Sequence, residues 1–237
     1  MKVLVIGGSG LVGSLVLPYL KQRHTLRVFD LKPPAHPEVE YVHGSVLDYE
    51  AVKAAAAGMD AVQYMVMGML SGPEIPYAES AFDLNVKGVF LALHAAGAAG
   101  VAHAVHCSSL SVYDGALDTR YFFDEDMPPD ARGVYGITKR MGEEVCRNAW
   151  VLHGMSVNAL RLCLPTPRDK WLAQARIGKP WIATEAEDVA GAMLGALEYR
   201  NGFQAFMISG DYENKIMNMS KARRLLNWEP QARPVQS

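Results

Sequence analysis

The sequence contains few cysteines, and those it has lie far apart. Only Cys107, Cys146 and Cys163 occur in 237 residues, and no two of them have C-x-x-C spacing. Disulfide frameworks and structural zinc sites need more cysteines at closer spacing. We therefore expect reduced, mostly buried thiols, no metal site and a cytoplasmic protein.

Long apolar runs and long basic runs are also absent. No stretch approaches the roughly 20 apolar residues that cross a bilayer. The formal net charge is -2, from 23 Lys and Arg against 25 Asp and Glu. Binding to nucleic acid or to an anionic membrane needs a basic surface. The expected partner is therefore a small-molecule substrate, with no nucleic acid and no membrane involved.

Apolar, β-branched runs alternate with helical patterns along the chain. Continuous apolar strands separated by helices predict an α/β fold, a Rossmann-type doubly wound parallel sheet with helices on both faces. The strands are expected over 2–6, 25–30, 40–46, 60–66, 101–108, 157–164 and 203–209. The helices are expected over 11–23, after Asp48, and over 82–99, 135–153, 187–199 and 220–227.

Two segments depart from this alternation. The stretch 114–132 is rich in Asp and Pro, and loops of that length in compact domains are often functional. The run PTPRDKW, which follows Leu164, looks irregular and predicts the start of a small cap. We expect a dinucleotide-binding domain over 1–165 together with about 184–210, and a substrate-side cap over 166–183 and 211–237.

Three glycines follow the first strand and open the first helix. Gly7, Gly10 and Gly13 have G-x-x-G-x-x-G spacing, which permits a tight turn, close approach of a pyrophosphate and close packing of helix on strand. The helix N-terminus offers N–H groups and partial positive charge to phosphates. Asp30 ends the second strand, where a carboxylate can hold the adenosine ribose hydroxyls.

This carboxylate would repel a 2′-phosphate, so the pattern favours NAD over NADP. Arg27 and Lys32 lie close to Asp30 and leave some NADP use open. Glycine turns after strands are common, and Asp30 could simply end its strand.

Tyr135 and Lys139 are four residues apart on a predicted helix, so their side chains share one face. A free tyrosine has a pKa of about 10, too high for a base near neutral pH. The Lys139 ammonium and a positive nicotinamide would lower the pKa of Tyr135. Tyr135 could then exchange a proton with a substrate hydroxyl while a hydride is transferred, and Lys139 could hold the nicotinamide ribose. The spacing alone is uninformative, because exposed helices often produce it.

Ser109 ends the fifth predicted strand, at the sheet edge where open α/β sheets bind ligands. Its hydroxyl could hydrogen-bond the substrate oxygen and align it with Tyr135. Ser108 and Ser111 compete for this role, and each serine could instead satisfy turn backbone. The functional prediction rests on the conjunction of glycine turn, acidic strand end, serines and Tyr/Lys pair in this order.

With these motifs the chain resembles the extended short-chain dehydrogenase/reductase family, also called the NAD-dependent epimerase/dehydratase family. The resemblance extends over nearly the whole chain. It rests on VIGGSGLVG (5–13), Asp30, LNVKGV (84–89), SSLSVY (108–113), YGITK (135–139), RLCLP (161–165), EDVAGA (187–192), FMISG (206–210) and KARRLLNWEP (221–230).

The resemblance implies a catalytic set of Ser109, Tyr135 and Lys139, with NAD as the cofactor. It implies a homodimer through the helices near 82–99 and 134–153. Beyond the glycines, Asp30, Tyr135 and Lys139, it places cofactor contacts at Leu11, Val12, Leu31, Ser45, Val46, Met65, Val66, Met67, Asn85 and Leu164.

The chain also departs from the family pattern. Ile6 stands where the family often has Thr, and Ser45 stands where it usually has an Asp that contacts adenine. Met65, Val66 and Met67 replace small residues, which crowds the pocket or reshapes its mouth.

The same resemblance also indicates which reactions of the family to expect here. Family dehydratases tend to carry Thr-Asp-Glu where this chain has Ser109, Leu110 and Ser111, which disfavours dehydration. Nucleotide-sugar epimerases need a substantial C-terminal domain, whereas only residues 166–237 follow Pro165 here. A small, unactivated substrate therefore fits better.

The compact cap resembles that of uronate dehydrogenases, in which an arginine after the sixth strand holds the substrate carboxylate. Arg168 matches that position and could bind a carboxylate through two hydrogen bonds. It could equally be a surface arginine near Asp169. Leu110 replaces a polar residue of those enzymes. Substrate contacts are expected at Met69, Ser109, Leu110, Ser111, Arg168 and Trp171.

The predicted function is reversible NAD-linked hydride transfer on a small hydroxyl-bearing substrate, a sugar or sugar acid. A sugar epimerase with tightly bound NAD is the alternative within the family. A dinucleotide-sensing regulator without catalysis is the alternative from another class, and the intact Ser/Tyr/Lys set argues against it.

Overall fold

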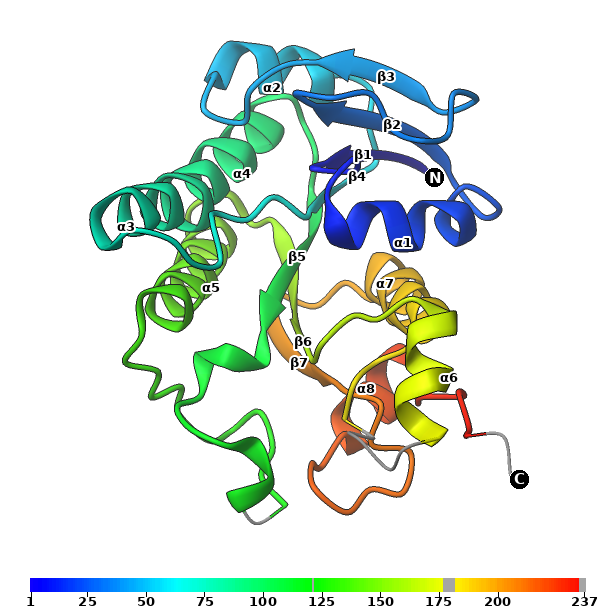
Figure 1. The fold of residues 1–237 in the computed structure, drawn as a ribbon. Coiled ribbons are helices and arrows are strands. Elements are labelled where there is room, and N and C mark those ends of the chain that lie inside the picture. The colour runs from blue at the N-terminus through cyan, green and yellow to red at the C-terminus, as the bar shows by residue number, and fades with distance from the viewer. Residues whose placement is uncertain (121, 177–181, 235–237) are drawn as a thin grey trace.

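The computed structural model describes residues 1–120, 122–176 and 182–234 (Figure 1). Its centre is a seven-stranded parallel sheet with the order β3-β2-β1-β4-β5-β6-β7. This arrangement confirms the predicted Rossmann-type sheet. The strands are β1 (Lys2–Ile6), β2 (Thr25–Asp30), β3 (Glu40–His43), β4 (Ala61–Tyr64), β5 (His103–Ser109), β6 (Ser156–Leu162) and β7 (Phe203–Ile208).

Helices cover both faces of the sheet and form two apolar cores (Figure 1). One core contains residues of α1, α7 and α8, and the other contains residues of α2, α4 and α5. The helices are α1 (Leu11–Leu20), α2 (Tyr49–Ala56), α3 (Glu74–Phe82), α4 (Gly88–Ala98), α5 (Val134–His153), α6 (Arg168–Arg176), α7 (Ala186–Glu198) and α8 (Ser220–Leu226).

Three strands end two or three residues earlier than the sequence predicted. β3 ends at His43 rather than at residue 46, because the chain turns there and Asp48 N donates to Ser45 O at 3.0 Å. β4 ends at Tyr64 rather than at residue 66, and β6 ends at Leu162 rather than at residue 164. These corrections move residues of the predicted cofactor site from strands into loops at the carboxyl edge of the sheet.

The helix predicted over 82–99 begins eight residues earlier, at Glu74 of α3. It passes through a π-helical turn over Asp83–Lys87 before α4 begins. No helix was predicted over 74–81. Pro73 is the N-cap of α3 and Pro76 lies in its first turn, where proline is tolerated because the N–H groups have no intrahelical acceptor.

The segment after Leu164 was expected to be irregular, yet α6 forms there. Trp171 anchors the helix, since it is buried and its Nε1 donates to Ala183 O at 2.8 Å. Residues 177–181, where the predicted cap continues, lie outside the described residues, as do 235–237. The division into a cofactor domain and a cap stays a prediction.

The three cysteines are free and buried, as predicted. None of the described helices is long and apolar enough to cross a membrane. The two helices expected at a dimer interface expose Phe90 and Met141. Pairing of two copies through them stays a prediction.

Candidate functional site

The glycine turn leads directly from β1 into α1. Gly7 has φ +86°, and a side chain on Gly13 would come within 2.3 Å of Gly8 O, so the helix packs tightly on the turn. Gly10 is the N-cap and has no side chain to cap the helix. The N–H groups of the first turn are therefore available to an anionic ligand such as a pyrophosphate.

Asp30 lies beside this turn at the end of β2. Its Oδ2 accepts a hydrogen bond from Ser9 N at 3.0 Å, and its Oδ1 accepts one from Lys32 N at 3.3 Å. The carboxylate is thus placed next to the glycine turn, where it could receive ribose hydroxyls.

Tyr135 and Lys139 lie in the first two turns of α5, which packs against β5 and β6. The close approach needs Gly136, because a side chain there would come within 2.2 Å of Ser111 O. Lys139 Nζ donates to Cys107 O at 2.9 Å and lies 5.8 Å from the centre of the Tyr135 ring. Both residues therefore meet at the carboxyl end of β5.

Lys139 is only 2% exposed. Burial disfavours its charged form and lowers its pKa to about 8, while the thiols of Cys107 and Cys146 and the carboxylate of Glu143 act in the opposite direction. At neutral pH the ammonium remains the main form. It is a buried positive charge, whose electrostatic effect on nearby groups is stronger than it would be in water.

Burial raises the pKa of Tyr135, and a hydrogen bond with Ser109 acts in the opposite direction. Burial is the largest cause, so the pKa of Tyr135 in the chain without a cofactor is raised, whereas the prediction of a lowered pKa concerned the site with both the Lys139 ammonium and a bound nicotinamide. The positive charge of a bound nicotinamide would favour the phenolate and lower the pKa of Tyr135.

The three serines at the end of β5 have different partners. Ser108 Oγ donates to Glu143 Oε1, so its proton is already used. Ser109 Oγ accepts from Ser111 N at 3.1 Å and hydrogen-bonds with Tyr135 rather than with Glu143. Ser111 is exposed. This division favours Ser109 over Ser108 as the donor to a substrate oxygen.

Asn85 connects the loop after β4 with the helix that carries Tyr135. It lies fully buried in the π-helical turn. Its Oδ1 accepts from Gly68 N at 3.1 Å, and its Nδ2 donates to Thr138 Oγ1 at 3.0 Å. Thr138 Oγ1 in turn donates to Tyr135 O. π-Helical turns often occur at functional sites, and this one anchors the candidate catalytic helix.

A cavity of about 340 Å³ lies over these groups. It brings the start of α1, the loop after β4, the end of β5 and α5 together. Its size falls in the range of small-molecule sites. Its lining comprises Leu11, Val12, Met65, Met67, Leu70, Cys107, Ser108, Ser109, Ser111, Tyr135, Lys139, Leu162, Leu164 and Pro165.

A second cavity of about 240 Å³ adjoins the first and shares Ser109, Ser111, Leu162 and Leu164 with it. Leu164 has φ +42°, a left-handed backbone that is strained for a leucine, and strained residues cluster at functional sites. The lining of the second cavity is completed by Leu110, Tyr113, Gly115, Leu117, Cys163 and Ile182.

Several predicted site residues do not line either cavity. Arg168 is exposed and lines another hollow together with Glu185 and Glu187. Trp171, a residue of α6, is buried, and Met69 is 44% exposed. Of the predicted cofactor contacts beyond the glycine turn, those outside both cavities are Asp30, Leu31, Ser45, Val46, Val66 and Asn85.

The sequence matches the family described as "NAD dependent epimerase/dehydratase family" over residues 3–167. The chain belongs to this family. That membership confirms the predicted resemblance.

The individual curated relatives match only part of this chain. The chain is 33% identical to "3 beta-hydroxysteroid dehydrogenase/Delta 5-->4-isomerase" of Mycobacterium tuberculosis (strain CDC 1551 / Oshkosh), over 72% of this chain and 47% of that protein. It thus spans less than half the length of the first curated relatives it matches.

Two solved structures have the same fold over 98% of the chain. One is a short-chain dehydrogenase/reductase superfamily protein from Agrobacterium tumefaciens with bound NAD, at a TM-score of 0.79, 23% identity and 93% coverage of its chain. The other is a mutated uronate dehydrogenase, at a TM-score of 0.80, 20% identity and 82% coverage. At this identity the likeness concerns the fold.

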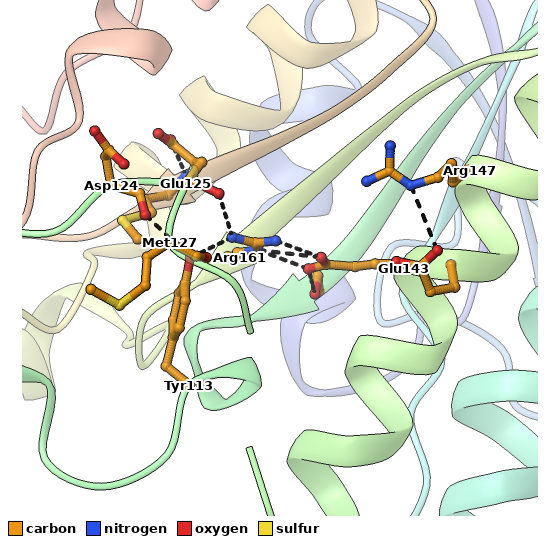
Figure 2. A network of polar contacts seen from close by, with 10 residues as sticks. Tyr113, Asp124, Glu125, Met127, Glu143, Arg147 and Arg161 are labelled. Carbon is orange, nitrogen blue, oxygen red and sulfur yellow. Dashed lines mark hydrogen bonds and ion pairs between the residues drawn. The ribbon is translucent and has the colours of Figure 1, made fainter. Parts of the chain in front are cut away.

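A buried polar network lies between α5, the strands β6 and β7, and the loop after β5 (Figure 2). Arg161 of β6 forms an ion pair with Glu143 of α5 at 2.8 Å, and both side chains are 5% exposed. Arg161 also donates to the Tyr113 hydroxyl and to Glu125 O. Glu125 accepts from Met207 N of β7 at 2.7 Å. The network therefore joins α5, two strands and the loop after β5.

Neither this network nor the partners of the candidate catalytic residues were predicted from the sequence. Thr138 and Cys107 lie within or beside recognised motifs, but their contacts depend on how α5 is placed on the sheet. The alternation of buried and exposed positions gives no signal that Glu143 and Arg161 pair, because all seven residues of β6 are buried.

We predict that Glu143→Gln destabilises the fold by about 3 kcal/mol or more, because it leaves the buried Arg161 guanidinium without a counter-charge. Urea unfolding measures this loss. Glu144→Gln is the matched control, since Glu144 is 73% exposed and forms a 3.6 Å surface pair with Arg147. The control should change the free energy of unfolding by less than about 0.5 kcal/mol. Equal effects of the two substitutions would contradict the role of the network.

We also predict a pH-dependent gain of stability from Lys139→Met. The folded pKa of about 8 lies below the ordinary value of 10.5, so only the unfolded chain keeps this proton between those values. The fold therefore gains stability from this group as pH rises through that window. The variant should be more stable than the parent by ~3 kcal/mol at pH 7, and the difference should shrink toward pH 10.

Urea unfolding at both pH values measures this difference. Lys87→Met is the control, because the Lys87 side chain is 60% exposed and carries little burial cost. A gap between Lys139→Met and the parent that is the same at pH 7 and pH 10 would refute the assignment to Lys139.

Proposed function

We propose that this protein is an NAD-dependent oxidoreductase that transfers a hydride reversibly between NAD and a small hydroxyl-bearing substrate. The observation that carries the proposal is the meeting of Ser109, Tyr135 and Lys139 in one cavity with Leu11 and Val12 of the glycine turn. Tyr135, which can transfer a proton, and the glycine turn, which can bind a dinucleotide, then line the same cavity.

The residues fit NAD. The uncapped start of α1 can receive the pyrophosphate, and the Asp30 carboxylate beside Ser9 can receive the adenosine ribose. Lys139 and Tyr135 line the opposite part of the cavity, where the nicotinamide half belongs. When bound, NAD supplies the hydride acceptor, or as NADH the hydride donor.

The side chains divide the remaining work. Tyr135 takes the proton of the substrate hydroxyl during oxidation and returns it during reduction. Ser109 donates a hydrogen bond to the substrate oxygen and holds it toward Tyr135. The Lys139 ammonium, fixed at Cys107 O, stabilises negative charge on the phenol oxygen.

Sugars and sugar acids are the substrates that the sequence resemblance implies. The uronate dehydrogenase among the similar structures supports a free sugar acid, and the hydroxysteroid dehydrogenase supports oxidation of a ring hydroxyl. Net formation of NADH separates a dehydrogenase from an epimerase, which would interconvert epimers without accumulating NADH. The assay is therefore decisive for the class of reaction.

Tyr135→Phe should lower the rate of NADH formation at least about a hundredfold, because it removes the proton acceptor. Affinity for NAD should stay within about threefold, since the ring remains in place. Initial rates by absorbance and NAD binding by calorimetry measure the two effects. Tyr49→Phe on α2 is the control and should leave both unchanged. Undiminished turnover in Tyr135→Phe would overturn the proposed role.

Asp30→Asn should narrow the preference for NAD over NADP about tenfold, an effect of roughly 1.4 kcal/mol. The amide neither repels a 2′-phosphate nor accepts ribose hydroxyls as strongly as a carboxylate. Dissociation constants for both dinucleotides measure the ratio. Asp60→Asn is the matched control, because Asp60 also accepts a backbone hydrogen bond, from Lys2 N, but precedes β4. An unchanged ratio in Asp30→Asn would show that Asp30 does not face the ribose.

A further inference from the structure

A further hollow, of about 600 Å³, lies between α5 and the loop that precedes this helix. Its size falls in the range of small-molecule sites. Its described lining shares no residue with the two cavities at the carboxyl end of β5. We call it the arginine hollow, and it is lined by Pro129, Ala131, Arg132, Ile137, Arg140, Met141, Glu143, Glu144, Arg147 and Arg161.

The charges of this lining are unevenly divided. The described lining contains four guanidinium groups and two carboxylates, which leaves a formal charge of +2. The chain as a whole has a formal net charge of -2. Positive charges that gather in one hollow repel each other, and an anion bound among them relieves this repulsion. The arginine hollow is therefore a positively charged site on a protein whose net charge is negative.

Two of the arginines are held by uncharged groups. Arg140 Nη1 donates to Ala131 O at 3.0 Å, and the guanidinium carbon of Arg147 lies 4.6 Å from the centre of the Phe203 ring. Arg147 also pairs with Glu144 at 3.6 Å, but both side chains are exposed, and solvent screens such a pair strongly. Both guanidinium groups are thus placed in advance for a ligand, which lowers the entropy lost on binding.

The other two arginines differ in how well their charge is neutralised. Arg161 is buried and pairs with Glu143 at 2.8 Å, so these two residues add little net charge (Figure 2). Arg132 is exposed, and its Nε lies 3.5 Å from the partly exposed carboxylate of Asp114. A ligand can replace such a loose surface pair at small cost. An anion would therefore contact the guanidinium groups that have uncharged or solvent-screened partners.

We propose that the arginine hollow binds the phosphate group of a small molecule, with Arg132, Arg140 and Arg147 as its ligands. A guanidinium group donates two parallel hydrogen bonds to phosphate oxygens. A phosphate ester carries about two negative charges at neutral pH, which matches the formal charge of the lining. None of the candidate catalytic residues lines the hollow, so this site does not depend on the proposed function.

The test is calorimetric titration of the purified full chain with inorganic phosphate, ribose 5-phosphate and acetate. Saturating NAD+ is present, because its pyrophosphate then occupies the start of α1, where a phosphate would otherwise compete. Both phosphates should bind at least about tenfold more tightly than acetate, which carries a single charge. Tighter binding of ribose 5-phosphate than of phosphate would identify an ester as the ligand, and equal binding would identify free phosphate.

Arginine variants test the location. Arg140→Gln should raise the dissociation constant of ribose 5-phosphate about tenfold, because it removes one charged donor. Arg132→Gln should act in the same direction from the loop, where it leaves α5 intact. Arg224→Gln is the matched control, because Arg224 is also a helical arginine, exposed on α8, and does not line the hollow. Its dissociation constant should stay unchanged, and urea unfolding checks that each variant is folded.

Three results would overturn the proposal. The first is the absence of binding by either phosphate. The second is equal weakening in Arg140→Gln and Arg224→Gln, which would indicate a non-specific attraction of anions. The third is binding that NAD+ displaces and that Arg140→Gln leaves unchanged, which would place the phosphate at the start of α1. Failure of the dehydrogenase assay would not affect this test, since the variants locate the phosphate whether or not NAD+ binds.

Discussion

The buried ammonium of Lys139, held by the carbonyl of Cys107, is the constraint on which the candidate site depends. It fixes α5 on the carboxyl end of β5 and brings Tyr135 to the serines that follow this strand. A charge buried to this degree costs stability unless it is paired, so its retention indicates a use beyond packing. Asn85 adds a second attachment through Thr138, which ties the same helix to the loop after β4.

The Arg161–Glu143 pair, drawn in Figure 2, supports this arrangement one turn further along the same face of α5. Because Glu143 accepts the hydrogen bond from Ser108 Oγ, Ser109 is the buried hydroxyl of the two that is able to donate to a substrate. By holding Tyr113, Arg161 fixes the loop that lines the second cavity. One polar network thus contacts residues that line both cavities, and its mutual hydrogen bonds offset the cost of burying its polar groups.

The sequence was sufficient for the sheet, the glycine turn, Asp30 and the Tyr/Lys helix, because each depends on local periodicity or spacing. It was insufficient for features that depend on tertiary contacts, such as helix limits, side-chain directions and pKa values. The helix α3 was not predicted, and α6 forms where an irregular segment was expected, anchored by the buried Trp171. Arg168 had the right position in the sequence for a carboxylate ligand, but the direction of its side chain depends on how α6 packs. The pKa of Tyr135 also depends on burial, which spacing does not reveal.

The most direct test of the account is a crystal structure of the protein with NAD+ bound. The account predicts the pyrophosphate at the start of α1 and the nicotinamide between Met65 and Tyr135, with C4 about 3–4 Å from the space where a substrate carbon bonded to an oxygen at Ser109 would lie. A nicotinamide outside the cavity that Tyr135 and Lys139 line would contradict it.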